Sequence, residues 1–256
     1  MNDLLERYIK AQNYEKITED CIAWIRSWFE KNGSDSPAVI GISGGKDSTA
    51  VAALCAEALG KDRVFGVLMP NGVQPDIDVS RAVVKHLGIK SAEVNIRDGF
   101  LGIENAVISG LGCGELSRQT VINLAPRLRM AAQYAVSQSL NGRVSNNSNR
   151  SEKYVGYSTI FGDSAGDFSP LSDLTVTEVR IVGRILGLPA EFVEKPPSDG
   201  LSSRTDEDAF GFTYEDLDTY ILTGECENEI TRQRIEQRHR ANLFKLQPMA
   251  AFRKEG

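Results

Sequence analysis

The clearest candidate for chemistry in this chain is a glycine-rich turn within VIGISGGKDST, residues 39–49. The apolar run before the turn predicts a buried strand, and the run STAVAALCAEALG after it predicts a helix that ends at Gly60. A strand-to-helix turn offers backbone N–H groups and the positive end of the helix dipole, and both attract anions. Residues 43–48, SGGKDS, therefore predict an anion-binding turn.

Two common phosphate-binding patterns do not fit this turn. A Walker A loop fails because Asp47 stands where Ser or Thr is required and Ile40 stands where the first glycine is required. A Rossmann fingerprint fails because Gly41, Gly44 and Gly45 have the wrong spacing. The turn therefore belongs to neither the P-loop nor the dinucleotide-binding type.

A nucleophile elbow, G-x-S-x-G, does match the turn at residues 41–45, with Ser43 as the nucleophile. A serine hydrolase also needs a histidine, and this chain has two, His86 and His239. His86 falls in a predicted crossover helix and His239 in the charged run RIEQRHRAN, so neither lies in a loop after a strand. The sequence disfavours a hydrolase but leaves it as an alternative.

The acid within the turn indicates a metal ion. Gly44 and Gly45 let backbone N–H groups approach phosphate oxygens closely, and Ser43 and Ser48 can donate their hydroxyl groups. The carboxylate of Asp47 would repel a bare phosphate, but it fits the turn if Mg²⁺ lies between the two. An ordinary Asp/Ser helix cap is the alternative that the turn alone leaves open.

The surrounding elements predict a single α/β domain over residues 1–256. Strands and helices alternate along the chain, which indicates a parallel sheet with crossover helices. Strands are expected at residues 36–43, 63–70 and 91–96, with a further short strand after residue 141. We expect a doubly wound parallel sheet of about five strands with extra N- and C-terminal helices.

Helical periodicity also covers the first thirty residues and two segments near the end, 214–224 and 228–247. A longer helical pattern at 120–142 contains Pro126. A proline inside a helix removes a hydrogen bond and crowds the preceding turn, so it predicts a kink or a helix start near Asn123.

Composition excludes some classes of partner. The net charge of −6 disfavours nucleic-acid binding through a basic face, and no apolar run approaches the length needed to cross a bilayer, which is about 20 residues. The chain opens without a signal-peptide pattern. The four cysteines, Cys21, Cys55, Cys113 and Cys226, are isolated, which indicates reduced thiols rather than disulfides or a metal site. We therefore expect a cytoplasmic protein that binds neither nucleic acid nor membrane.

The turn SGGKDS resembles the pyrophosphate-binding loop of the ATP pyrophosphatases, which adenylate their substrates. Five further motifs follow in the order typical of the ammonia-dependent NAD synthetases within that family. These motifs are NLAPRLRM (123–130), NNSNRSE (146–152), GYSTIFGDSAGDFSPLSDL (156–174), KPPSDGL (195–201) and TDEDAFGFTYEDLD (205–218). The resemblance covers roughly residues 37–248 and implies an ATP-dependent ligase with an adenine nucleotide α-hydrolase-like fold.

The resemblance implies a role for each matching residue. It places Asp47, Ser48 and Glu152 in catalysis, with Asp47 and Glu152 as the Mg²⁺ ligands. ATP-binding positions are Gly41, Ser43, Gly44, Gly45, Lys46, Asp47, Ser48, Gln74, Asn147 and Ser198. Deamido-NAD-binding positions are Arg127, Asp163, Asp167 and Lys245. Plainer alternatives stay open for some of them: an exposed loop amide for Gln74, a helix-surface arginine for Arg127 and turn aspartates for Asp163 and Asp167.

The reaction implied by the resemblance has two steps. The nicotinate carboxylate of deamido-NAD attacks the α-phosphorus of ATP and pyrophosphate leaves. Ammonia then attacks the acyl-adenylate and gives NAD⁺ and AMP. The chain is too short to include a glutaminase domain of several hundred residues, so we expect free ammonia as the nitrogen source. The resemblance also implies a homodimer.

Four positions depart from the family pattern, and each has lost a cation. Val176 stands where a lysine usually reaches the phosphates, and Leu68 stands where some relatives have arginine. Phe244 replaces a histidine that often precedes the lysine at 245, and Ile160 replaces a lysine found in some members. The dinucleotide site is therefore expected to carry less positive charge than usual.

These departures keep two alternatives open. One is an ATP pyrophosphatase that adenylates another carboxylate, although a tRNA-modifying enzyme would usually carry a CxxC motif or a basic face. The other is a nucleotide-binding paralogue with weak activity, suggested by Val176. Lys46 and Arg180 are the cations that could replace the missing lysine.

Overall fold

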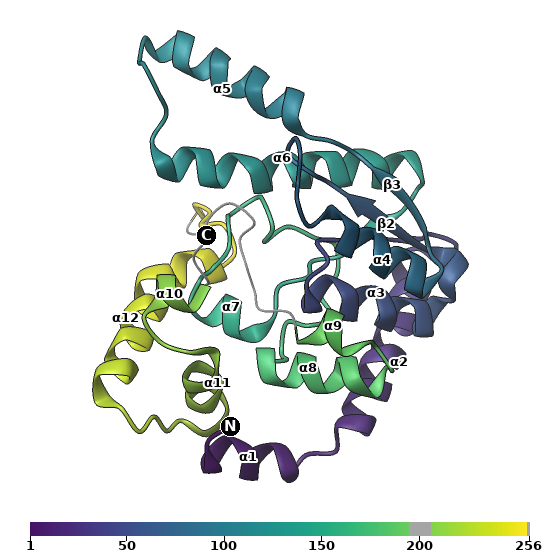
Figure 1. The fold of residues 1–256 in the computed structure, drawn as a ribbon, viewed down its shortest axis with the longest axis vertical. Coiled ribbons are helices and arrows are strands. Elements are labelled where there is room, and N and C mark those ends of the chain that lie inside the picture. The colour runs from purple at the N-terminus through teal and green to yellow at the C-terminus, as the bar shows by residue number, and fades with distance from the viewer. Residues whose placement is uncertain (195–205, 255–256) are drawn as a thin grey trace.

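The computed structural model describes residues 1–194 and 206–254. Its centre is a parallel sheet in the order β3-β2-β1-β4 (Figure 1). The strands are β1 (Ala38–Gly41), β2 (Val64–Leu68), β3 (Lys90–Glu93) and β4 (Arg143–Val144). In register, Ala38 lies opposite Val64 on one side and opposite Arg143 on the other. The predicted doubly wound α/β fold is confirmed.

The sheet has four strands among the described residues, where about five were expected. The position beside β4 is taken by an isolated parallel bridge between Ser145 and Phe168. The chain there is the turn GDSAGD, and the side chain of Asp167 accepts a hydrogen bond from the backbone N–H of Val144 at 2.7 Å. A side chain thus replaces one rung of the ladder, so the segment does not extend into a fifth strand.

Helices α3 (Lys46–Leu59) and α4 (Ile77–Leu87) form the two crossovers between β1, β2 and β3, with the short 3₁₀ turn η1 (Lys61–Arg63) before β2. Helix α3 is apolar on most of its surface because it is packed between the sheet and α2 (Tyr14–Asn32). Phe29 of α2 meets the ring of Phe168 edge to face at 5.1 Å. Together these elements make the main core.

A second apolar core lies in the C-terminal half of the chain. Its side chains come from or next to α7 (Arg150–Tyr154), α8 (Val176–Ile185), α10 (Asp206–Phe210), α11 (Tyr214–Thr223) and α12 (Glu229–Leu246). Two further helices pack beside these elements: α1 (Asp3–Lys10) against α11, and α9 (Ala190–Val193) against α3 and α8. Its buried side chains are Val155, Val176, Phe210, Phe212, Tyr214, Leu217 and Ile235. Figure 1 shows α1 beside α11, and Asn2 donates a hydrogen bond to Thr219 at 2.9 Å. The predicted C-terminal helices therefore build this core, and the first helix packs against it through α11.

Helices α5 (Arg97–Leu111) and α6 (Arg118–Ser139) form an arm at the opposite end of the molecule from α1 (Figure 1). Helix α6 begins eight residues before Pro126, at Arg118, so the expected helix start near Asn123 is wrong. The Ser117 hydroxyl caps the helix by accepting the Thr120 N–H at 3.2 Å. This cap sets the start of α6, and the proline is accommodated inside the helix.

In the described parts of the chain, no helix is both long and apolar enough to span a membrane.

Gly166 gives a direct test of the packing beside β4. A Cβ atom at this position would lie 2.5 Å from the backbone nitrogen of Asn146, which cannot move as a flexible side chain would. Gly166→Ala should therefore lower the free energy of unfolding by about 1–3 kcal/mol in urea denaturation. Gly102→Ala is the control: nothing lies within 4 Å of that Cβ in α5, and alanine should stabilise the helix by about 0.5–1 kcal/mol. Equal effects at both positions would contradict the steric argument.

Candidate active site

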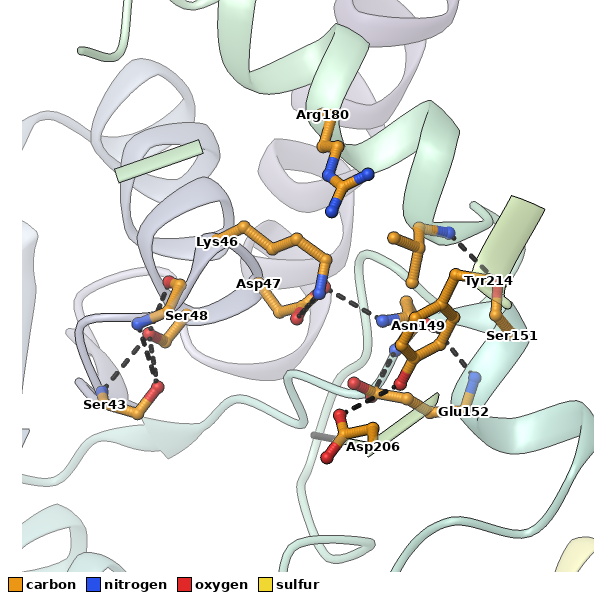
Figure 2. A network of polar contacts seen from close by, with 12 residues as sticks. Ser43, Lys46, Asp47, Ser48, Asn149, Ser151, Glu152, Arg180, Asp206 and Tyr214 are labelled. Carbon is orange, nitrogen blue, oxygen red and sulfur yellow. Dashed lines mark hydrogen bonds and ion pairs between the residues drawn. The ribbon is translucent and has the colours of Figure 1, made fainter. Parts of the chain in front are cut away.

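The turn after β1 is built around two serines and two glycines. Gly44 adopts a left-handed φ of 77°, and a Cβ there would lie 3.1 Å from the backbone nitrogen of Ser80 in α4. Gly45 is the N-cap residue of α3, and no side-chain hydrogen bond caps this end of the helix. The hydroxyls of Ser43 and Ser48 lie 3.1 Å apart (Figure 2). Within the turn, the N–H groups of Ser43 and Gly45 donate to the hydroxyls of Ser48 and Ser43, next to the positive end of α3, which favours an anion.

Asp47 and Glu152 come together from two distant parts of the chain. Asp47 is in the first turn of α3, and Glu152 is in the short helix α7 that follows β4. Asn149 links them: its amide donates to Asp47 Oδ1 at 3.0 Å, and its backbone N–H donates to Glu152 Oε2 at 3.3 Å (Figure 2). The predicted pair of carboxylates is therefore present on one side of the turn.

The environment of Glu152 favours its protonated form. Burial raises the pKa of Glu152, the nearby charge of Asp47 raises it further, and Lys46 partly opposes them, for a pKa of about 8. Asp206 adds a smaller upward effect on this pKa. The carboxyl group of Glu152 is thus held where a cation would be needed to stabilise its ionised form.

Lys46 supplies a buried positive charge beside these acids. Its side chain is 3% exposed, and its ammonium pairs with Asp47 Oδ2 at 2.9 Å. Burial alone would lower the pKa of Lys46, but Asp47 and Glu152 raise it, and the net shift is upward. The lysine therefore stays charged. Figure 2 shows Arg180 of α8 directed toward Lys46 from the far side of the group.

Three residues of this group had no predicted role: Asn149, Asp206 and Tyr214. The hydroxyl of Tyr214 donates to Asp206 Oδ2 at 3.1 Å, and its ring lies 5.7 Å from the Lys46 ammonium. Asn149 was detectable from the sequence, because Asn-x-x-Glu before a helix is a capping-box pattern. Asp206 and Tyr214 carried no comparable signal, since only the second core brings them here.

The other predicted ATP residues lie at the ends of β1 and β2. Asn147 donates to the backbone oxygen of Gly41, the last residue of β1, at 3.0 Å. Gln74 is in the loop after β2 and donates to Asp76 at 2.9 Å. Ser198 lies outside the described residues. Asn147 therefore lies at the same sheet edge as the turn, and Gln74 follows the neighbouring strand.

Three of the residues predicted to bind deamido-NAD lie in the segment 156–163 or contact it. Arg127 of α6 donates to the backbone oxygen of Ile160 at 3.3 Å. Lys245 of α12 donates to the backbone oxygen of Gly156 at 2.8 Å, and Asp163 accepts the N–H of Thr159 at 2.8 Å. One loop thus brings together cations from two helices that are far apart in sequence.

Asp167, the fourth of these predicted residues, lies beside β4. Its carboxylate accepts the Val144 N–H and, at 3.1 Å, the hydroxyl of Tyr134 in α6. In this structure Asp167 holds the loop against the sheet.

The structure also accounts for the valine at 176. Val176 is fully buried in the second core, and its backbone N–H donates to the hydroxyl of Ser151 at 3.0 Å. A lysine side chain would have to leave this apolar cluster to place its charge in water. Phe244 is 65% exposed, whereas Leu68 is buried.

The hydrolase alternative is wrong. Ser43 bonds to Ser48 and to the N–H of Gly45. His239 bonds to the backbone oxygen of Tyr154 at 2.7 Å and stacks on its ring, and His86 packs against the ring of Phe192. Neither histidine is available to Ser43, so no catalytic triad forms among the described residues.

The parallel sheet and its SGGKDS turn define a nucleotide-binding α/β protein with the adenine nucleotide α-hydrolase fold. The chain belongs to the NAD synthase family, whose model matches residues 17–256. An NH(3)-dependent NAD(+) synthetase from Pyrococcus furiosus is 40% identical over 214 residues, which is 83% of this chain and 79% of the relative. The protein is accordingly a ligase that binds ATP.

Solved structures agree with this assignment. An NMN synthetase from Francisella tularensis superposes with a TM-score of 0.85 at 28% identity, covering 94% of this chain and 98% of the other. An NH3-dependent NAD synthetase from Campylobacter jejuni superposes with a TM-score of 0.74 at 28% identity, covering 94% of this chain and all of the other (100%).

Asn149 can be tested in its two roles separately. Asn149→Ala removes both the helix cap and the amide that holds Asp47, so it should lower the free energy of unfolding by about 1 kcal/mol and reduce ligase activity. Asn149→Ser keeps a capping oxygen but loses the donor to Asp47. It should therefore retain most of the stability and still lose activity, as measured by urea denaturation and by pyrophosphate release. Full activity in the serine variant would contradict a role in positioning Asp47.

Proposed function

We propose that this protein amidates deamido-NAD to NAD⁺ with ammonia and ATP, through an acyl-adenylate, and releases AMP and pyrophosphate. The observation that carries the proposal is the SGGKDS turn with Asp47 held beside Glu152 by one asparagine. The relatives named as ammonia-dependent NAD synthetases support the choice of substrate and nitrogen source.

The turn suits the departure of pyrophosphate. The start of α3 supplies backbone N–H groups, and the hydroxyls of Ser43 and Ser48 are held in place before any ligand binds, because they bond to each other and to the backbone of the turn. Fixed donors stabilise the negative charge that develops on the leaving group without the cost of reorganising. Gln74, Asn147 and Ser198 are assigned to the rest of the ATP molecule.

Asp47 and Glu152 fit a Mg²⁺ site. No cluster of three or more His, Cys, Asp or Glu side chains able to hold a metal occurs within residues 1–194 and 206–254. Mg²⁺ at nucleotide sites commonly takes one or two carboxylates and completes its shell with phosphate oxygens and water, so a pair of acids is an adequate donor set. When bound, the ion would neutralise charge on the ATP phosphates.

Arg127, Asp163, Asp167 and Lys245 are assigned to deamido-NAD. Lys245 already lies close enough to Asp163 for each charge to affect the pKa of the other. Arg127 is exposed on α6, and its planar guanidinium is suited to a pyrophosphate oxygen pair. The two aspartates keep the loop between these cations in shape, because each accepts a backbone N–H from it or from the adjacent strand.

A mononucleotide is the second candidate substrate. The Francisella neighbour described as an NMN synthetase has a TM-score of 0.85, compared with 0.74 for the Campylobacter NAD synthetase at the same 28% identity. Ile160 and Leu68 also reduce the number of cations available to a second phosphate. Nicotinate mononucleotide is the substrate that this alternative implies.

One assay separates these candidates. Pyrophosphate release would be measured with ATP and Mg²⁺ plus either deamido-NAD or nicotinate mononucleotide, with and without ammonium. We expect release that depends on deamido-NAD, with NAD⁺ formed only when ammonium is present. A preference for the mononucleotide would select the second candidate. Release with neither substrate would overturn the amidation proposal and point to another carboxylate.

Glu152 should make nucleotide binding release protons. Its pKa of about 8 means that the group is mostly protonated at pH 7, whereas a Mg²⁺ ligand must be ionised. Binding of ATP with Mg²⁺ at pH 7 should therefore release about one proton, and the affinity should rise between pH 7 and 9. Calorimetry in buffers of different ionisation enthalpy measures the proton count. Glu152→Gln should abolish the release, and proton-neutral binding by the native protein would contradict the assignment.

We also propose that residues 1–256 form a single domain and that the protein is a cytoplasmic homodimer. The arm supports the dimer: Ile103, Val107 and Leu111 recur every four residues along α5 and are 43%, 36% and 72% exposed. Helical residues at this spacing share one face, so the arm presents an apolar stripe to solvent.

The stripe predicts how the dimer can be broken. Ile103→Glu places a charge in the apolar stripe and should give a monomer by light scattering at micromolar protein concentration. Asn105→Glu adds the same charge to an exposed position of α5 away from the stripe, and it should leave the dimer intact. A native protein that is monomeric, or a dimer that survives both changes, would rule out this interface.

A further inference from the structure

Lys46 is a deeply buried charged group in contact with Asp47, and its side chain is 3% exposed. Its ammonium lies against Asp47 Oδ2 at 2.9 Å and above the ring of Tyr214 at 5.7 Å. Glu152 also acts on its charge. Figure 2 shows the ammonium between α3 and the acids of α7 and α10. Lys46 therefore lies where a cation bound by Asp47 and Glu152 would also have to lie.

Both oxygens of Asp47 are already engaged. Oδ2 pairs with the Lys46 ammonium, and Oδ1 accepts the amide of Asn149 at 3.0 Å. A divalent cation that binds Asp47 brings two positive charges next to an ammonium that is shielded from water. Like charges in a partly buried site repel strongly, so the ion and the ammonium cannot both stay beside this carboxylate.

The same lysine could also reach a polyphosphate bound at the turn. Lys46 is the first residue of α3, directly after Gly45, so it starts at the turn whose N–H groups face an incoming phosphate chain. Its side chain is a flexible four-carbon stem with a compact charge, which allows the ammonium to change partner without moving the backbone. A polyphosphate is the anion that the turn is built to receive.

We propose that Lys46 is a placeholder cation: it neutralises Asp47 in the ligand-free protein and moves to the polyphosphate when a divalent cation takes its place. The inference rests on the proposed function, because it assumes that ATP and a divalent cation bind at this turn. It follows that metal and polyphosphate bind cooperatively, since the polyphosphate removes the charge that excludes the metal. The protein without nucleotide should bind divalent cations poorly.

The test uses Mn²⁺ and inorganic pyrophosphate with the full chain, so it needs neither deamido-NAD nor turnover. Mn²⁺ binding is followed by electron paramagnetic resonance and by calorimetry, with and without pyrophosphate. For the native protein we expect weak Mn²⁺ binding alone and binding at least about tenfold tighter with pyrophosphate. Lys46→Met should bind Mn²⁺ alone about tenfold more tightly than the native protein and should lose most of the coupling.

Lys153→Met is the matched control. Lys153 is adjacent to Glu152 and interacts with its charge, but its ammonium bonds to Ser169 at 3.1 Å and to Ser172 at 2.6 Å. Removing this charge should leave the coupling between Mn²⁺ and pyrophosphate unchanged. If Lys153→Met increases Mn²⁺ affinity as much as Lys46→Met does, a general charge effect explains the result and the proposal is overturned.

Two further outcomes separate this inference from the proposed function. Tight Mn²⁺ binding by the native protein without pyrophosphate overturns the placeholder role alone, and it does so even if Lys46→Met does not fold. Failure of the native protein to bind Mn²⁺ with pyrophosphate overturns the proposed function as well. Asp47→Asn should abolish Mn²⁺ binding with pyrophosphate, because it removes the carboxylate for which the lysine and the metal compete.

Discussion

The repulsion between Asp47 and Glu152 is the constraint on which the rest of the site depends. Burial of Glu152 is the main reason that its pKa is raised to about 8, and the nearby charge of Asp47 raises this pKa further, because two close carboxylates in a partly buried site repel each other. The structure meets this constraint with one amide, from Asn149, and one ammonium, from Lys46.

Holding Glu152 in place requires the second core. Ser151, its neighbour in α7, donates to the buried carboxylate of Asp218 in α11, which also accepts the N–H of Thr177 at 2.8 Å. Burial raises the pKa of Asp218 to about 6, but these hydrogen bonds favour its ionised form. This network ties α7, α8 and α11 together. The C-terminal helix α11 therefore helps to position Glu152, although the sequence presented it as an addition to an α/β sheet.

The sequence predicted what depends on local pattern. The turn at 43–48, the strand before it and the helix after it were correct, because glycine spacing and apolar periodicity act over short distances. The pairing of Asp47 with Glu152 came from family resemblance. Tyr214 could not be predicted, since its place beside Lys46 depends on how distant helices pack. The start of α6 was missed because the cap at Ser117 determined it more strongly than Pro126.

The loss of the lysine at position 176 is consistent with the charge balance of this site. Val176 packs in the same apolar cluster as Tyr214. The ring of Tyr214 also lies 5.7 Å from the Lys46 ammonium. Arg180, one helical turn after Val176, already acts on the charge of Lys46. A further ammonium from position 176 would add to that repulsion. Lys46 of α3 and Arg180 of α8 thus supply positive charge beside these acids, while position 176 is filled by an apolar side chain of the second core.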